Sequence, residues 1–258
     1  MITVLSPAKT LDYDPQKLTK KHTVPEFLDD SRQLIDQLAK MTKPRVAKLM
    51  GISDKLAELN VSRYKSWQTP FTTENAKQSL LAFKGDVYQG FQCEKWKAAD
   101  FTFAQKHLRI LSGLYGLLRP LDLMQPYRLE MGTKLKTKRG RDLYDFWGDS
   151  ITDSLNVAIK TSRSTAFVNL ASNEYFSSVN AEDISVPIVT PVFKDEKNGK
   201  YKIISFFAKK ARGMMANWII ENKVKDPAAL KNFKVGGYKF VKSESDEKIL
   251  VFFRKEQT

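Results

Sequence analysis

Several short apolar runs in the chain are typical of buried β-strands. They are Ile2–Leu5, Ala166–Leu170, Ile188–Lys194, Tyr201–Phe207, Tyr238–Val241 and Ile249–Arg254. Asn198-Gly199 lies between two of these runs and is a strong hairpin signal. Pro191 predicts a sheet edge or a bulge, because proline cannot donate a ladder hydrogen bond. The runs Leu80–Phe83 and Leu108–Leu111 are too short for periodicity to distinguish a strand from a helix end.

Other segments have apolar residues at helical spacing, which predicts amphipathic helices. These segments are Glu26–Lys40, Leu143–Ile159 and Ala211–Asn222. Between the first two, Pro44 suits the first turn of a short helix that Gly51-Ile52 would end. Ser53 can then cap a further helix through Leu59. Helices and strands are intermixed without a regular βαβ repeat, so we expect a mixed α/β or α+β fold.

Composition indicates a globular chain and narrows its chemistry. The 258 residues are 42% hydrophobic and 11% aromatic, which excludes global disorder, and we expect one domain over residues 1–258. No run approaches the roughly 18 apolar residues of a membrane span, and the N-terminus lacks the features of a signal peptide. With one cysteine (Cys93) and two histidines (His22 and His107), we expect a reducing, cytoplasmic location, no metal and no cofactor. We further expect a monomer that binds no membrane.

The chain is strongly basic, with 43 Lys and Arg against 29 Asp and Glu, a formal charge of +14. Five basic residues and no acid lie between Lys134 and Arg141, and segments 40–65 and 194–242 carry net charges of +5 and +9. Residues 142–191 carry −5. These alternating blocks predict a basic side of the fold. Such a surface attracts polyanions, among which nucleic acid is the commonest, then anionic small molecules; solvated surface lysines are the plainer interpretation.

Familiar catalytic signatures are absent from the sequence. There is neither a Gly-x-Gly-x-x-Gly turn nor a Gly-x-x-x-x-Gly-Lys-Ser/Thr loop. Cys93 has no basic partner in its neighbourhood, so we do not interpret it as a nucleophile. His107 is interpreted as a helix-surface or core residue rather than a base. We therefore expect no enzymatic activity.

Leu49–Ala57 resembles the helix-hairpin-helix motif, whose usual form is Leu-Pro-Gly-hydrophobic-Gly-x-x-x-Ala. In that motif small residues let the backbone approach a phosphate, which binds to N–H groups at the next helix N-terminus. Ser53 replaces the second glycine, so an ordinary connection between two helices is an equal alternative. The candidate DNA-binding residues of this element, which spans about residues 43–60, are Lys48, Met50, Gly51, Ile52, Ser53 and Lys55.

A second cluster of charged residues lies in the Gly-, Pro- and Tyr-rich segment 108–132. It contains Arg109, Arg119, Arg128 and Glu130. Turn-rich segments with embedded arginines occur at anion sites, and they also occur as buried connections. The segment by itself does not distinguish these two interpretations.

Seven strings, in order along the chain, are long and specific. They are Ser6–Asp12, Phe83–Tyr88, Leu111–Gly116, Leu118–Asp122, Pro126–Gly132, Asn169–Phe176 and Phe207–Gly213. Together they resemble the bacterial YaaA peroxide-stress protein family. The resemblance implies a cytoplasmic protein of the peroxide response that protects DNA and lowers free iron. It also implies a single-domain mixed α/β fold peculiar to the family, with a helix-hairpin-helix element and a basic cleft for duplex and branched DNA. Because the chain offers so few nitrogen and sulfur ligands, we interpret the effect on iron as indirect.

Two functional hypotheses follow from these patterns. The first is a protective protein that binds DNA with little sequence specificity; the second is an enzyme acting on DNA or on an anionic metabolite. Our candidates for the basic cleft are Lys9, Lys84, Arg119, Arg128, Lys209, Lys210 and Arg212. Convergence of most of these with Asp12, Asp86, Glu130 and Asn173 in one cleft would favour the enzyme.

Overall fold

The computed structural model describes residues 1–256 and is built around one mostly parallel sheet of eight strands. The strand order is β11-β12-β9-β8-β1-β5-β6, with β10 paired to β9. The bounds are β1 Ile2–Leu5, β5 Leu108–Ser112, β6 Gly116–Leu118, β8 Phe167–Leu170, β9 Ile188–Lys197, β10 Lys200–Lys202, β11 Lys239–Phe240 and β12 Ile249–Arg254. Strands β12, β9, β8, β1 and β5 run parallel, whereas β6, β10 and β11 pair antiparallel to their neighbours.

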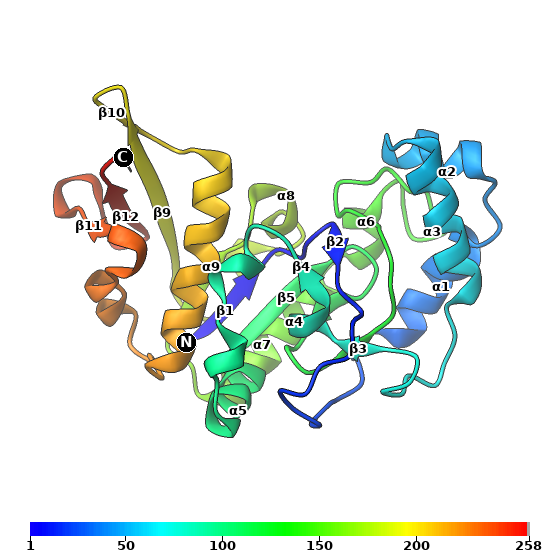
Figure 1. Cartoon of the computed structure of the whole chain (residues 1–258), viewed down its shortest axis with the longest axis horizontal. Helices are drawn as coiled ribbons and strands as arrows, with labels where there is room; N and C mark the ends of the chain where they lie inside the picture. The colour runs from blue at the N-terminus through cyan, green and yellow to red at the C-terminus, as the bar shows by residue number, and fades with distance from the viewer. Residues whose placement is uncertain (257–258) are drawn as a thin grey trace.

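Two small ribbons and a set of helices complete the fold (Figure 1). The ribbons pair β2 (Thr10–Leu11) with β4 (Phe83–Lys84) and β3 (Lys77–Gln78) with β7 (Leu123–Met124). The α-helices are α1 Leu28–Leu38, α2 Lys43–Met50, α3 Asp54–Ser66, α4 Ser79–Ala82, α5 Ala98–His107, α6 Leu143–Trp147, α7 Ser150–Ser162, α8 Asn173–Phe176 and α9 Ser205–Glu221. The 3₁₀ turns are η1 Tyr88–Gly90, η2 Cys93–Lys95, η3 Ala181–Asp183, η4 Pro227–Asn232, η5 Val235–Gly237 and η6 Lys242–Glu244. Helices α1–α3 form one end of the molecule, and β9–β12 form the other.

The core lies along the central strands. Every residue of β1 and β8 is buried, as expected for parallel strands covered on both faces. Helix α9 packs across β1, β8 and β9, and α7 packs against β1 and β6. One contiguous hydrophobic cluster joins these elements, which supports the prediction of a single mixed α/β domain.

The order of the strands creates a topological switch point between β1 and β8. From β1 the chain passes to β5 on one side, and from β8 it continues to β9 on the other. The connections that leave the carboxyl ends of β1 and β8 therefore diverge. In open α/β sheets a ligand commonly binds in the crevice at such a point, so the segments after Leu5 and Leu170 are where the fold predicts a site.

Most predicted strands are confirmed. Asn198 and Gly199 both adopt positive φ, as a tight hairpin requires, but the second arm ends at Lys202 because α9 begins at Ser205. The prediction of a strand through Phe207 is therefore wrong. The other predicted strands coincide with β1, β8, β9, β11 and β12, and Leu108–Leu111 is the strand β5. Leu80–Phe83 is mainly the short helix α4, which ends as β4 begins.

Pro191 lies where one side of β9 has no partner strand. Strand β8 pairs with β9 only at Ile188 and Val189, whereas β12 pairs with β9 from Thr190 to Asp195. A residue without an N–H is tolerated at an unpaired side of a strand. The prediction of an edge at Pro191 is thus confirmed locally, although β9 lies inside the sheet.

The predicted helices need one correction. Leu143–Ile159 is two helices, α6 and α7, because Gly148 adopts φ +46° and ends α6. Elsewhere the predictions hold with shifted ends: α1 spans Leu28–Leu38, and α3 runs on to Ser66. Pro44 lies in the first turn of α2, and the Ser53 hydroxyl accepts the Leu56 N–H at 3.4 Å.

His107 is a buried core residue. Its Nδ1 lies 3.0 Å from the Met1 carbonyl oxygen and so carries the proton of this hydrogen bond, and its ring packs on Phe103. Burial lowers the pKa of His107 to about 4, although the bond to Met1 opposes that shift. This lowering of the pKa from the ordinary value of 6.5 means that the folded chain disfavours the protonated imidazole by about 3 kcal/mol relative to the unfolded chain.

We predict that this histidine makes the fold sensitive to acid. The unfolded chain binds a proton near pH 6.5 and the folded chain near pH 4, so the free energy of unfolding falls by about 3 kcal/mol across this interval. The variant His107→Asn keeps an N–H donor without titrating. Urea denaturation at pH 7 and pH 4 should show a smaller acid loss in the variant than in the wild type. An equal loss in both proteins would contradict this role of His107.

No helix in residues 1–256 is both long and apolar enough to cross a membrane. Cys93 is partly buried in η2, and burial raises the pKa of its thiol to about 12. The thiolate needed for nucleophilic attack is therefore disfavoured.

Candidate functional site: a pocket and groove lined by cations

A pocket of about 380 Å³ opens at the switch point of the sheet. Its walls come from the carboxyl end of β1, the β4–η1 segment, residues 127–130, the start of α8 and the first half of α9. The polar and charged residues that line it are Ser6, Lys9, Thr10, Lys84, Asp86, Tyr127, Arg128, Glu130, Ser172, Glu174, Tyr175, Lys209 and Arg212. We call this cavity the switch-point pocket.

The floor of the switch-point pocket is held by hydrogen bonds between the two diverging strand ends. The Ser6 hydroxyl accepts the Ser172 N–H at 2.8 Å and donates to the Ser172 hydroxyl at 3.2 Å. The buried Tyr88 hydroxyl donates to the Ser6 carbonyl oxygen at 3.1 Å. Because these groups are already bonded to each other, the ends of β1 and β8 are fixed before any ligand arrives.

A close backbone contact places α9 beside the pocket. Gly213 in α9 faces η1 so closely that a Cβ there would overlap the Val87 carbonyl oxygen, and a Cβ on Gly90 would overlap the α9 backbone. Glycine is required where two backbones approach in this way. The contact holds Lys209 and Arg212 over the Asp86–Val87 side of the pocket.

Most cations of the pocket have a carboxylate partner. Glu130 accepts from Lys9 at 2.7 Å and from Arg128 at 2.9 Å. Lys84 pairs with Asp12 at 3.1 Å, and Lys209 lies 3.9 Å from Asp86. These pairs stand at the surface of the pocket and contribute little to stability, but they fix the side chains in place.

Arg212 is different from its neighbours. Within residues 1–256 it is the one cation lining the pocket that forms neither a hydrogen bond nor an ion pair, and its side chain is half-buried. This partial burial lowers the pKa of the Arg212 guanidinium. A half-buried guanidinium without a protein partner is poised to receive an anion.

Tyrosines supply the remaining polar wall. Burial raises the pKa of Tyr175 well above its ordinary value, and burial likewise raises the pKa of Tyr127. Both hydroxyls therefore stay protonated at neutral pH. Tyr127 is joined to Ser112 at 2.6 Å, so it is already engaged with the end of β5.

The pocket continues into a wider depression, which we call the central groove. Glu130 and Glu174 line both, and the central groove has a volume of about 970 Å³. One wall is the α1–α2 region, and the other is the chain segment 132–136. Four cations line it, and within residues 1–256 none of their side chains forms a hydrogen bond or an ion pair: Arg45, Lys48, Lys134 and Lys136.

A further depression of about 530 Å³, the outer groove, shares Gln37, Met41 and Arg45 with the central groove. Its cations are Lys40, Arg45, Lys138 and Arg139. Arg139 is paired with Asp30 at 2.6 Å and lies over the Phe146 ring. The pocket and the two grooves therefore adjoin one another, and we call them together the basic furrow. Segments 40–48 and 134–139 contribute to it, as do Lys209 and Arg212.

The turn between α2 and α3 stands next to the central groove, since Leu49 and Met50 line that groove. Gly51 adopts φ +60° and caps α2, and both its N–H and that of Ile52 donate to the Ala47 carbonyl oxygen. These two N–H groups are therefore not free to bind a phosphate as the sequence pattern predicts. The N–H groups of the first turn of α3, beginning at Asp54, have no intrahelical partner.

Most cleft residues predicted from the sequence do converge. Five of the seven predicted cations line the switch-point pocket, namely Lys9, Lys84, Arg128, Lys209 and Arg212. Asp86 and Glu130 join them there, and Asp12 lies next to the pocket as the partner of Lys84. Lys210 and Asn173 are not among the lining residues. Of the predicted hairpin residues, Lys48 and Met50 line the central groove, whereas Gly51, Ile52, Ser53 and Lys55 do not.

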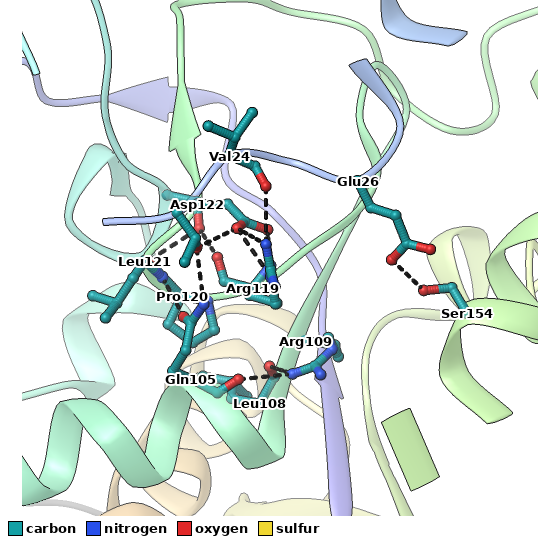
Figure 2. A network of polar contacts seen from close by, with 12 residues as sticks. Val24, Glu26, Gln105, Leu108, Arg109, Arg119, Pro120, Leu121, Asp122 and Ser154 are labelled. Atoms are coloured by element: carbon teal, nitrogen blue, oxygen red, sulfur yellow. Dashed lines mark hydrogen bonds and ion pairs between the residues drawn. The ribbon is translucent and has the colours of Figure 1, made fainter. Parts of the chain in front are cut away.

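Arg119 is placed elsewhere, so its assignment to this cleft is wrong. Figure 2 shows its side chain turned toward the buried Asp122, whose Oδ1 it contacts through Nε at 3.0 Å, and toward the Val24 carbonyl oxygen at 2.9 Å. Asp122 needs this partner because it is almost fully buried. Arg119 and Arg109 both line a different cavity from the switch-point pocket. There Arg109 donates to the carbonyl oxygens of Gln105 and Leu108.

Sequence reasoning missed several residues of the furrow. Glu174 and Ser172 lie in the string 169–176, but as single polar residues after a strand they carried no distinguishing signal. Arg45 lies inside the basic segment 40–65 without being singled out. Among residues 1–256 there is no group of three or more His, Cys, Asp or Glu side chains arranged to hold a metal ion.

A comparison with known families identifies the family to which the chain belongs. The family model described as peroxide stress protein YaaA matches residues 1–244, which is nearly the whole sequence. The strings that line the switch-point pocket, including Ser6–Asp12, Pro126–Gly132 and Phe207–Gly213, all lie within this match. The resemblance recognised in the sequence is thereby confirmed, and the chain belongs to the peroxide stress protein YaaA family.

Proposed function

We propose that the protein binds duplex and branched DNA along the basic furrow as part of the peroxide-stress response. The observation that supports this most is that the two adjoining grooves of the furrow carry seven cations on both walls. A phosphate backbone laid along them would exchange its counterions for these side chains. Lysine and arginine side chains that contact phosphates carry no sequence information, so in this proposal the binding has little sequence specificity.

The α2–α3 turn adds one phosphate contact in this proposal. The turn acts as a helix-hairpin-helix element through the N–H groups of Asp54 and Lys55 at the start of α3, since the Leu56 N–H is already bonded to Ser53. Asp54 stands at that helix end with 80% of its side chain exposed, and its charge opposes the phosphate. The contact is therefore weaker than in a hairpin with glycine at Ser53 and no acid after it.

Protection of DNA in the cytoplasm is the role that we propose for this binding. A bound protein shields the sugar–phosphate backbone from oxidants. The lowering of free iron is indirect in this proposal, because nitrogen and sulfur ligands are few in the chain.

We predict that affinity for DNA depends steeply on salt and little on sequence. With about six phosphate contacts, affinity should fall by about a thousandfold between 50 and 200 mM salt. Fluorescence anisotropy of two unrelated duplexes and one four-way junction across a salt series measures this. A flat salt dependence, or a strong preference for one duplex sequence, would refute the proposal.

An enzyme acting on DNA or on an anionic metabolite is the second candidate function. It is favoured by the convergence of charged residues of both signs in the switch-point pocket, which binding to a phosphate backbone alone does not require. Turnover of DNA or of a phosphorylated metabolite by the purified protein, lost in Arg212→Ala, would establish it.

A further inference from the structure

The three carboxylates of the switch-point pocket are unexpected in a surface that binds a polyanion. Asp86, Glu130 and Glu174 all line it, together with five cations. By contrast, no carboxylate lines the central groove apart from Glu130 and Glu174 at its junction with the pocket. Asp86 and Glu130 are partners of the pocket cations, but within residues 1–256 Glu174 forms no ion pair. A carboxylate without a cation partner repels a phosphate backbone, so Glu174 indicates a ligand with hydrogen-bond donors as well as a negative charge.

Two charged residues of the pocket, Arg212 and Glu174, have no partner of opposite charge within residues 1–256. Arg212, on α9, has no partner, and nearby Lys209 has only the long 3.9 Å contact with Asp86. Glu174, on α8, uses one oxygen, Oε1, to accept the Gly132 N–H at 3.0 Å. Within residues 1–256 its Oε2 has no hydrogen-bond partner, which leaves an acceptor at the entrance to the central groove.

The size of the pocket limits its occupant. A volume of about 380 Å³ is near the lower end of the roughly 300–1,000 Å³ of small-molecule sites. It admits one nucleotide but not a duplex. The floor made by Ser6 and Ser172 is fixed at the carboxyl ends of β1 and β8, which is where phosphorylated ligands commonly bind in parallel sheets.

We propose that the switch-point pocket binds a single nucleotide, with its phosphate against Arg212 and Lys209 and the N–H or O–H groups of its base or sugar against Glu174. This inference rests on the proposed function in one respect: if the nucleotide comes from DNA, the protein must bind DNA in the furrow. A nucleotide swung out of DNA in the adjoining central groove can enter the pocket past Glu174. A free nucleotide offers the same chemistry.

Calorimetric titration with each of the four deoxynucleoside monophosphates tests the site directly. We expect binding by at least one of them, and at least a tenfold loss of affinity in Arg212→Ala. The matched control is Lys210→Ala, which removes a cation from the same helix outside the pocket lining and should bind as the wild type does. Circular dichroism verifies that both variants are folded.

The variant Glu174→Gln separates a nucleotide site from a simple anion site. In a site for phosphate alone, removing a negative charge strengthens binding of inorganic phosphate and of the mononucleotide alike. In the proposed site the variant binds inorganic phosphate more tightly but the mononucleotide more weakly. The Gly132 N–H holds the amide oxygen of the variant, so an NH2 donor replaces the acceptor that faces the base or sugar. Stronger binding of both probes would overturn the proposal.

A duplex containing 2-aminopurine distinguishes the sources of the nucleotide. A rise in its fluorescence on binding, lost in Arg212→Ala while DNA is still bound, shows that the nucleotide leaves the stack and enters the pocket. Mononucleotide binding without this rise supports a free nucleotide as the ligand. If DNA binds but neither mononucleotide binding nor the fluorescence rise is seen, the inference is wrong and the proposed function stands. If mononucleotides bind and DNA does not, the inference stands for a free nucleotide and the proposed function is wrong.

Discussion

Replacing Gly213 with alanine should lower the free energy of unfolding by about 3 kcal/mol. Gly213 is buried, and the added methyl group would overlap the Val87 carbonyl oxygen, which belongs to the backbone and cannot rotate away. Overpacking of this kind costs about 1–3 kcal/mol, and rigid backbone places it at the upper end. Alanine is the better helix former by about 1 kcal/mol, but that gain is too small to reverse the sign.

The same change should loosen the switch-point pocket. Any shift that relieves the overlap moves α9 away from η1, and Lys209 and Arg212 move with it. Urea denaturation measures the stability, and the midpoint should fall with little change in slope. Ser205→Ala, at the exposed start of the same helix, is the control and should stay near the wild-type midpoint. A Gly213→Ala protein as stable as the wild type would show that the contact yields easily.

Removing three cations from the central groove should have the largest effect on DNA binding. Lys48, Lys134 and Lys136 line that groove from its two walls. If each contacts a phosphate, the triple alanine variant has a salt slope shallower by about three and binds every sequence more weakly. Anisotropy titrations at several salt concentrations give this slope. An unchanged slope would place the DNA on another face of the protein.

The α2–α3 turn can be tested separately from the central groove through Asp54, which does not line that groove. Lys48 does line the groove, so its removal would not report on the turn alone. Asp54→Asn removes the acid at the start of α3 and should strengthen binding a few-fold if a phosphate contacts that helix end. The matched control is Glu58→Gln, the same charge change one turn further along α3. Equal effects of both variants would mean that the turn is structural.

How far the sequence predicts the structure differs between elements. The strands β1 and β8 were predictable because short segments with three apolar residues in four favour a sheet that is covered on both faces. The break between α6 and α7 was not, because the apolar spacing continues across Gly148 and only the positive φ of that residue ends the first helix. Periodicity reports which face is buried, not whether the backbone turns.

The candidate site shows the same division. Lys9, Arg128 and Arg212 could be selected from the sequence because each lies in a string typical of the family. Arg119 lies in an equally typical string, but its proximity to Asp122, three residues later, directs it into an internal ion pair. Whether an arginine is free or paired depends on neighbours that strand and turn geometry supplies, which the string does not encode.

By itself, the sequence determined the family, the mixed α/β class, the basic character and most cations of the pocket, since these depend on residue identity and local pattern. Only the tertiary structure decided that the ends of β1 and β8 meet at a switch point, and that segments 40–48 and 134–139 contribute to the basic furrow together with Lys209 and Arg212. Such juxtapositions depend on strand order and on backbone contacts such as that of Gly213 with Val87, which join residues far apart in the chain. The unpaired Arg212 acquires its meaning from that arrangement alone.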